Sequence, residues 1–270
     1  MTKKGIYIFS LLVLMVFMLD ACSSYQQVLK SKDPDFKYQK AIEYFEGEQY
    51  VRSQTLLDDI STYYKGTERA QEVLIYLARS YLGQKAYNSA ATYYETYIRN
   101  YPKGRYCIEA QYQIGHCYYL DAPDARLDQD ITRRSIAAFA KFIELYPESQ
   151  YVDQVYNEMN EMYDKLAYKE LLSAKLYYNL GTYLGNNYLS AELVARNALK
   201  DYPSNSYQED LNWIIMQAKY QQMVNSFENK KQERARDAED EYYSFKTEYP
   251  DSKHIKEADK MYKEIKKIVK

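Results

Sequence analysis

The stretch "YIRNYPKGRY" at residues 97–106 joins a helix-like segment to a tyrosine–proline pair and a turn, and variants of it recur. Related segments are "ELYPESQY" at 144–151, "KDYPSNSY" at 200–207 and "TEYPDSKH" at 247–254. Proline lacks an amide hydrogen and forces the preceding residue into an extended conformation, so each pair should end a helix. The small or polar residues that follow favour a turn before the next helix. The chain is therefore expected to be an array of repeated helix pairs.

The composition favours helix and argues against several function classes. The 270 residues include only 8 glycines and 6 prolines, and 34 of them are tyrosines. Helix breakers are thus scarce. The formal net charge of −2 provides no basic field, so no nucleic-acid partner is expected. The sequence carries no nucleophile, phosphate-loop or metalloprotease motif, and we expect no enzymatic activity, no metal and no cofactor.

Residues 68–103 show the pattern of one repeat most clearly. The small residues Ala78 and Ala90 would let two helices approach closely, and Tyr81 and Tyr94 would fill the space to the next pair. This pattern resembles the tetratricopeptide repeat, whose units must stack because none buries its apolar face alone. An all-α tetratricopeptide-repeat superhelix of about five helix pairs and a capping helix is predicted over residues 35–270. The expected repeats are 35–66, 68–103, 106–148, 151–204 and 206–250, with the capping helix at 252–268.

Two insertions interrupt the repeat register. A polar loop, "DAPDARLDQD" at 121–130, separates the two helices of the third repeat. An additional helix, roughly 152–168, is expected before the first helix of the fourth repeat. Ser206 and Glu209 have the spacing of a capping box at the start of the next helix.

The N-terminus has the features of a processing segment. A short positive region precedes a run of about 14 apolar residues and the sequence "LDAC" at 19–22, which resembles a lipoprotein cleavage site. We expect a signal peptide at 1–21 and lipid attachment at Cys22, through an N-acyl chain and an S-diacylglyceryl group. An ordinary secretory signal is the alternative. Residues 22–34 are expected to form a lipidated tether that reaches at most ~40 Å.

The other cysteines, Cys107 and Cys117, are ten residues apart on one expected helix. That spacing corresponds to about 15 Å along the helix axis, whereas a disulfide requires Cα atoms within about 7 Å. We expect both to be unpaired and buried.

The order of these features resembles a known family. The loop "RLDQD" at 126–130 and the stretch "DKLAYKELLSAKLYY" at 164–178 are the most specific parts. Together with the cleavage site and five repeats, they resemble the BamD family of outer-membrane assembly lipoproteins over essentially the whole mature chain. The chain departs from the family pattern at "GTYLGNN", residues 181–187, where it is longer and is expected to add either one helical turn or a longer connecting turn. The tyrosine content suggests a Bacteroidetes-like source.

The resemblance implies a scaffold of the β-barrel assembly machine that is anchored in the outer membrane and faces the periplasm. Its C-terminal repeats would bind the POTRA domains of a BamA-type barrel protein, and its N-terminal repeats would receive unfolded barrel proteins. Another periplasmic tetratricopeptide lipoprotein, serving a cell-wall or division complex or nutrient uptake, is the open alternative.

Repeat register selects candidate site residues on the first helices of the N-terminal repeats. They are Tyr38, Ile42, Phe45, Ile75, Arg79, Leu82, Tyr112, His116 and Tyr119. We expect an apolar and aromatic face with one cation, which accepts a peptide with aromatic side chains and binds its terminal carboxylate near Arg79. Alternatively, these residues pack against the tether or neighbouring helices. The candidates for contact with the BamA-type partner are Arg196, Lys200, Lys219 and Arg234.

Overall fold

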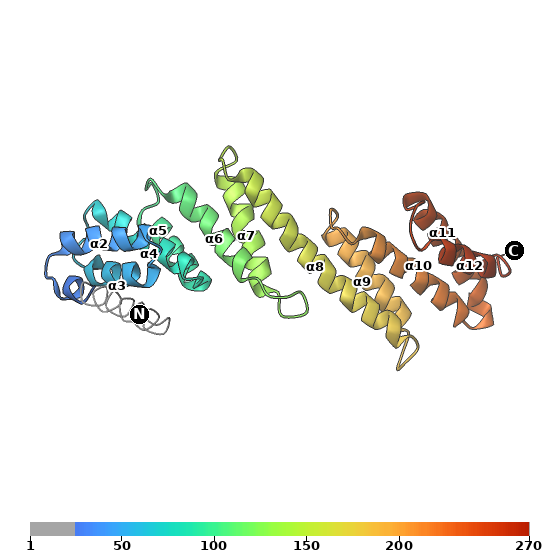
Figure 1. The fold of residues 1–270 in the computed structure, drawn as a ribbon. Helices are drawn as coiled ribbons and strands as arrows, with labels where there is room; N and C mark the ends of the chain where they lie inside the picture. Colours follow the sequence, from blue (N-terminus) through green and yellow to red (C-terminus); the bar gives the residue numbers. More distant parts are fainter. Residues whose placement is uncertain (1–24, 270) are drawn as a thin grey trace, which may run out of the picture. The chain divides into compact units, whose positions relative to one another are not determined.

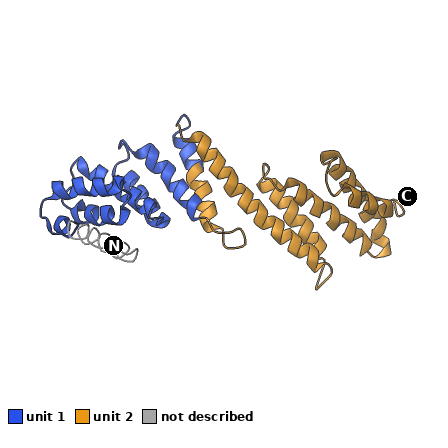
Figure 2. Ribbon diagram, viewed as in Figure 1, with its two compact units in different colours: residues 1–121, 140–149 blue, residues 122–139, 150–270 orange. Residues whose placement is uncertain are grey.

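The computed structural model describes residues 25–269, which form two compact units (Figure 2). Of the described residues, unit 1 comprises 25–121 and 140–149, and unit 2 comprises 122–139 and 150–269. The signal peptide expected at 1–21 and the lipid-attachment site Cys22 lie outside the described residues.

Every element within the described residues is an α-helix, and neighbouring helices pack against each other within each unit, as α2 does against α3 and α8 against α9 (Figure 1). Unit 1 contains α2 (Pro34–Glu46), α3 (Tyr50–Ser61), α4 (Arg69–Gly83), α5 (Tyr87–Asn100), α6 (Cys107–Asp121) and the end of α7 (Asp130–Leu145). Unit 2 contains the start of α7 and α8 (Val152–Leu180), α9 (Asn187–Asp201), α10 (Gln208–Val224), α11 (Glu228–Glu248) and α12 (Ile255–Ile265). The predicted all-α array of helix pairs with a final capping helix is confirmed.

The tyrosine–proline pairs end the second helices in one repeated conformation. Tyr101, Tyr202 and Tyr249 have φ angles of −132°, −130° and −127° and ψ angles of 65°, 67° and 62°. The amide of each donates a last hydrogen bond to the carbonyl four residues earlier, at 2.8–2.9 Å. The proline that follows has no amide to continue the ladder, so the helix ends there.

Small residues and aromatic residues build the core in the predicted manner. Ala78 and Ala90 are fully buried, as is the Tyr94 ring. Cys107 and Cys117 are free and buried, as expected. Burial raises the pKa of the Cys117 thiol to about 12, because a thiolate would lose its hydration there.

The segment expected as a tether is partly folded. Residues 25–30 form a short helix, and Val28 is buried in the core of the first repeat with Tyr25 and Leu29 packed beside it. The expectation of a tether over the whole of residues 22–34 is therefore wrong. Its apolar side chains recur at helical spacing, and they find apolar partners on the first repeat.

The fourth repeat also differs from the expectation. No separate helix exists at 152–168, because α8 runs without interruption for 29 residues and contains neither glycine nor proline. The insertion at 181–187 forms a longer turn, with positive φ angles at Gly181, Leu184 and Gly185. Ser206 forms no capping box: its amide donates to the Asp164 carboxylate of α8 at 2.7 Å.

The loop before α7 is ordered by a buried glutamine. The side-chain amide of Gln129 donates to the carbonyls of Asp124 and Leu127 at 2.8 and 3.1 Å. Lys165 of α8 donates to the Ala122 carbonyl at 3.1 Å, and Lys169 of α8 donates to the same Leu127 carbonyl at 2.6 Å. The loop's backbone acceptors are thereby satisfied by side chains, and the "RLDQD" stretch is fixed against α8.

Candidate functional site

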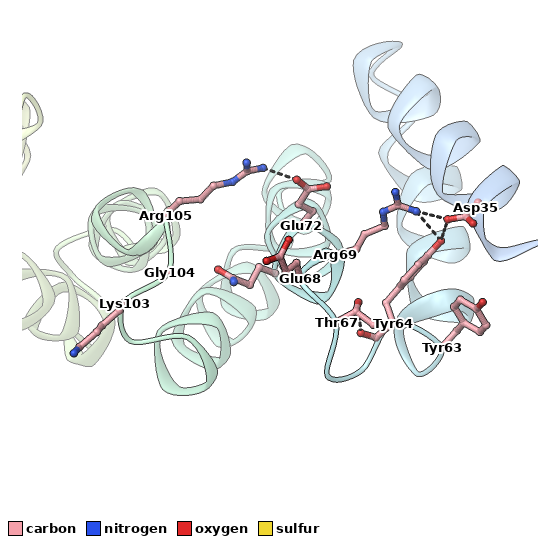
Figure 3. A pocket seen from close by; sticks show the side chains of 11 residues that line it. Asp35, Tyr63, Tyr64, Thr67, Glu68, Arg69, Glu72, Lys103, Gly104 and Arg105 are labelled. Carbon is pink, nitrogen blue, oxygen red and sulfur yellow. Dashed lines mark hydrogen bonds and ion pairs between the residues drawn. The ribbon is translucent and has the colours of Figure 1, made fainter.

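A pocket of about 830 Å³ opens in unit 1, where α2 and α4 begin and the turn between α5 and α6 passes (Figure 3). Its lining is mostly charged or polar. It consists of Asp35, Tyr63, Tyr64, Thr67, Glu68, Arg69, Gln71, Glu72, Lys103, Gly104 and Arg105.

The turn in "YIRNYPKGRY" brings two cations to this pocket. The Tyr97 hydroxyl donates to Gln71 Oε1 at 3.0 Å and accepts from the Tyr106 amide at 3.2 Å. A β-carbon on Gly104 would lie 2.3 Å from that hydroxyl, so glycine is the residue that fits beside it. The buried tyrosine therefore holds the turn that carries Lys103 and Arg105.

One edge of the pocket joins α2, α4 and the turn between α3 and α4 through a shared carboxylate. Asp35 accepts a hydrogen bond from the Tyr64 hydroxyl at 2.6 Å and forms an ion pair with Arg69. The Arg69 guanidinium also lies 5.0 Å from the Tyr38 ring centre and 5.3 Å from that of Tyr64. Cation–π contacts thus add to the ion pair, and they position one arginine between the first two repeats.

A second carboxylate, Glu72 of α4, accepts hydrogen bonds from α2 and from the turn between α5 and α6. The Tyr38 hydroxyl donates to Glu72 Oε2 at 2.6 Å, and Arg105 Nη2 donates to Oε1 at 2.6 Å. Burial and the bond to Glu72 raise the pKa of Tyr38, so this phenol stays protonated. The same nitrogen donates to the Tyr106 hydroxyl, and the guanidinium lies 4.5 Å from the Tyr106 ring centre. The Arg105 side chain is nevertheless 63% exposed, so an incoming anion can reach it.

The predicted carboxylate-binding residue, Arg79, already has an internal partner. Its Nε and Nη2 atoms donate to the two oxygens of Glu109 at 2.7 and 2.5 Å. The guanidinium lies 5.2 Å from the ring centres of both Tyr76 and Tyr106. Although burial alone would lower its pKa, Glu109 raises it, and Arg79 stays charged. A ligand carboxylate would have to compete with Glu109 for this cation.

The other candidate residues of the N-terminal repeats differ in accessibility. Ile75 and Tyr112 are buried and do not line an open face, since α4 contacts α2, α3 and α5 and the Tyr112 ring packs against Phe142. His116 stacks between two rings. The remaining candidates are partly buried, namely Tyr38, Ile42, Phe45, Leu82 and Tyr119.

None of the nine candidates lines the polar pocket, and the apolar peptide-binding face stays a prediction for the candidates that are not buried. Repeat register alone missed Asp35, Arg69, Glu72, Arg105 and Glu109. A signal for part of this set was present, because Arg69, Glu72, Tyr76 and Arg79 recur at intervals of three and four residues, which places them along one stripe of a helix.

In unit 2, two of the candidate partner-binding residues surround a buried acid. Glu192 Oε1 accepts from Arg196 at 3.0 Å and lies 3.1 Å from the Lys219 ammonium, and Oε2 accepts from Gln222 at 2.9 Å. Burial tends to raise the pKa of Glu192, but these three donors together lower it. Arg196 also donates to Glu241 at 2.5 Å, so the Glu192 cluster joins α9, α10 and α11.

The two other candidates in unit 2 differ from each other. Arg234 donates to the Gln222 carbonyl at 3.1 Å and to the Ser226 hydroxyl at 2.8 Å, which fixes it at the turn between α10 and α11. Lys200 is exposed near the end of α9. Arg196 and Lys200 are both exposed, but Arg196 is held by Glu192 and Glu241.

Comparison of the sequence with known proteins identifies a family for this chain. No helix within residues 25–269 is both long and apolar enough to cross a bilayer. No curated protein sequence matches the chain. A family model named YfiO and described as outer membrane lipoprotein matches residues 30–185, more than half of the chain. The chain therefore belongs to the YfiO family, the outer-membrane lipoproteins of the BamD type.

Proposed function

We propose that this lipoprotein is a scaffold of the β-barrel assembly machine, held at the periplasmic face of the outer membrane by the lipid on Cys22. Membership of the YfiO family carries this proposal. The cleavage-site sequence "LDAC" at 19–22 and the stacked helix pairs support it. Stacked repeats of this kind present extended surfaces for protein partners.

In this proposal the pocket of unit 1 receives unfolded barrel proteins. Tyr63 offers an exposed ring, while Arg105 and Lys103 offer accessible positive charge. A peptide with aromatic side chains and a free carboxylate suits this combination, because a guanidinium binds a carboxylate through two parallel hydrogen bonds. Arg79 is the second carboxylate-binding candidate, and there the peptide must displace Glu109.

The C-terminal repeats bind the POTRA domains of a BamA-type barrel protein in the same proposal. Lys200 is the accessible charged candidate. Exposed apolar residues gather where α8 turns into α9, namely Leu176, Leu180, Tyr183 and Leu184. Contiguous exposed apolar residues are typical of protein–protein contact surfaces.

Co-purification tests the partner. Outer membranes would be solubilised in mild detergent, and the tagged chain with Cys22 intact would be captured. We expect a POTRA-containing barrel protein at near-stoichiometric yield, and Cys22→Ser should release the chain from the membrane fraction. Recovery of cell-wall enzymes or a nutrient transporter in its place would overturn the assembly role.

Peptide binding tests the pocket. We expect Arg105→Glu to weaken binding of an aromatic peptide that has a free C-terminal carboxylate, and to change binding of the amidated peptide less. Arg99→Glu is the matched control, since Arg99 is exposed on α5 and does not line the pocket. Equal affinity of the Arg105→Glu and Arg99→Glu proteins for the free peptide would exclude this pocket as the carboxylate site.

A further inference from the structure

The short helix at residues 25–30 is part of the folded first repeat. Val28 is buried, and the Tyr25 ring meets the Tyr44 ring edge-on at 5.5 Å. The Arg52 guanidinium lies 5.0 Å from the Tyr25 ring centre and 5.6 Å from that of Tyr44. Burial of Val28 and the contacts of Arg52 with both rings hold the segment on α2 and α3.

The contacts of this segment fix its direction. The Ser31 amide donates to the Val28 carbonyl at 3.1 Å, and the Asp33 carboxylate caps α2 by accepting from the Asp35 amide at 2.9 Å. The chain thus reverses at residues 31–33. Because Tyr25 contacts Tyr44, near the end of α2, it lies at the turn that joins α2 to α3.

The distance from the lipid-attachment site to this turn is short. Cys22 precedes Tyr25 by three residues, and three residues span at most about 11 Å in any conformation. A lipid on Cys22 would consequently hold the turn between α2 and α3 close to the membrane surface. A flexible tether over the whole of residues 22–34 would impose no such limit.

The pocket of unit 1 lies at the opposite end of the same helices. Asp35 and Arg69, which line it, stand in the first turns of α2 and α4. At the other end of α4, a β-carbon on Gly83 would lie 2.5 Å from the Tyr50 ring, so this end of α4 is next to the turn between α2 and α3. The 13 residues of α2 separate the two ends by about 20 Å.

We propose that residues 25–30 are a docked anchor segment that orients unit 1 on a phospholipid surface. The turn between α2 and α3, with exposed Val51, faces the headgroups, and the pocket opens on the side away from them. Substrates then reach the pocket from the aqueous side. This inference rests on the lipid attachment at Cys22 in the proposed function.

Fluorescence quenching on vesicles tests the orientation. The lipidated full-length chain would be inserted into phospholipid vesicles that contain lipids with a nitroxide on the headgroup. A fluorophore would be attached through Val51→Cys or, in a second protein, through Lys103→Cys in the pocket. Labelling at these positions is selective, because Cys107 and Cys117 are buried. We expect clearly stronger quenching at position 51 than at position 103.

A spacer variant separates anchoring from docking. A flexible Gly/Ser spacer between Ser24 and Tyr25 leaves the docked helix intact but lengthens the connection to the lipid. We expect unchanged urea unfolding and equal quenching at the two positions. Val28→Asp should release the docked helix and also equalise the quenching.

Two outcomes would overturn the inference. Equal quenching at both positions of the vesicle-bound parent chain would exclude the orientation and leave the proposed function intact. Vesicle binding that does not depend on Cys22, measured with Cys22→Ser, would contradict the lipid anchor of the proposed function, and the orientation would be rejected with it.

Discussion

Arg79 in unit 1 and Arg196 in unit 2 are both predicted binding residues, and each forms an ion pair inside its own unit. The two ion pairs differ in which partner is buried. Arg79 meets a single acid, Glu109, and the two side chains are 25% and 21% exposed. Arg196 is one of three donors around Glu192, whose side chain is only 7% exposed. In unit 1 a ligand carboxylate would have to replace only this one, partly exposed acid. In unit 2 the acid is the buried group, and the cations around it compensate for its burial.

This difference in burial makes Arg79 a candidate for ligand binding and gives Arg196 a structural role. A buried carboxylate needs its donors, because an uncompensated charge is costly away from water. Arg196 and Lys219 are therefore needed inside unit 2 before either can serve a partner. Arg79 and Glu109 are partly solvated, and their separation is correspondingly less costly.

The largest expected effect is that of Glu192→Ala. Removal of this acid abolishes hydrogen bonds to two cations and Gln222, and should lower the free energy of unfolding by about 2–3 kcal/mol. Trp213, the only tryptophan of the chain, lies in the core of unit 2 and reports its urea unfolding by fluorescence. Asn197→Ala, at an exposed position of the same helix, is the matched control. If the two variants lost the same free energy of unfolding, the Glu192 cluster would have no special role in stability.

The pH dependence of unfolding tests the same cluster without deleting a side chain. The donors hold the pKa of Glu192 below its ordinary value of 4.5 in the folded state. The resulting stability is present above that ordinary value and is lost as the pH falls through the lower, folded-state pKa. The parent chain and Glu192→Gln should therefore differ at neutral pH and converge in acid, as measured by Trp213 urea midpoints. A difference that is constant across this range would contradict the lowered pKa.

A smaller effect is expected at the turn that carries the pocket cations. In Gly104→Ala the new β-carbon would displace the Tyr97 hydroxyl, which lies at the end of a side chain and can shift. Loss of its bonds to Gln71 and the Tyr106 amide should cost about 1 kcal/mol. Circular dichroism during urea unfolding measures this loss of stability. Gly66→Ala does not serve as a control, because Gly66 has a φ of +84° and alanine would be strained there. Lys103→Ala, in the same turn, is the control for a substitution that adds no β-carbon beside Tyr97. If Gly104→Ala is no less stable than Lys103→Ala, the turn does not depend on the contact with Tyr97.

Much of the fold was predictable because the tyrosine–proline pairs act locally. Each proline ends a helix whatever the rest of the chain does, so the helix pairs follow from the sequence alone. The single long helix α8 was harder to predict. The repeat register places two helices there, although the stretch contains no helix breaker. The docked helix at 25–30 was missed because its few apolar residues are stable only against partners on the first repeat.

The candidate site was predicted less well for a related reason. Register indicates which residues share a helix face, but not which charges find a partner on the next helix. Arg79 and Glu109 are 30 residues apart, as are Glu192 and Gln222. Neither contact has a local signature. That Arg79 forms an ion pair with an acid inside the protein could therefore be seen only in the folded structure.

The smallest change in stability, and the most informative about function, is expected for Glu109→Gln. The amide keeps the shape of the side chain and one acceptor for Arg79 but removes the negative charge, so the free energy of unfolding should fall by less than about 1 kcal/mol. Arg79 then meets a neutral competitor, and a peptide with a free C-terminal carboxylate should bind more tightly, while the amidated peptide should not. Isothermal titration with both peptides measures this, and Arg79→Gln should abolish the gain. If Glu109→Gln destabilised the chain as much as Glu192→Ala, the Arg79–Glu109 pair would be structural as well. The two arginines would then have the same structural role, and Arg105 of the pocket would be the remaining carboxylate-binding candidate in unit 1.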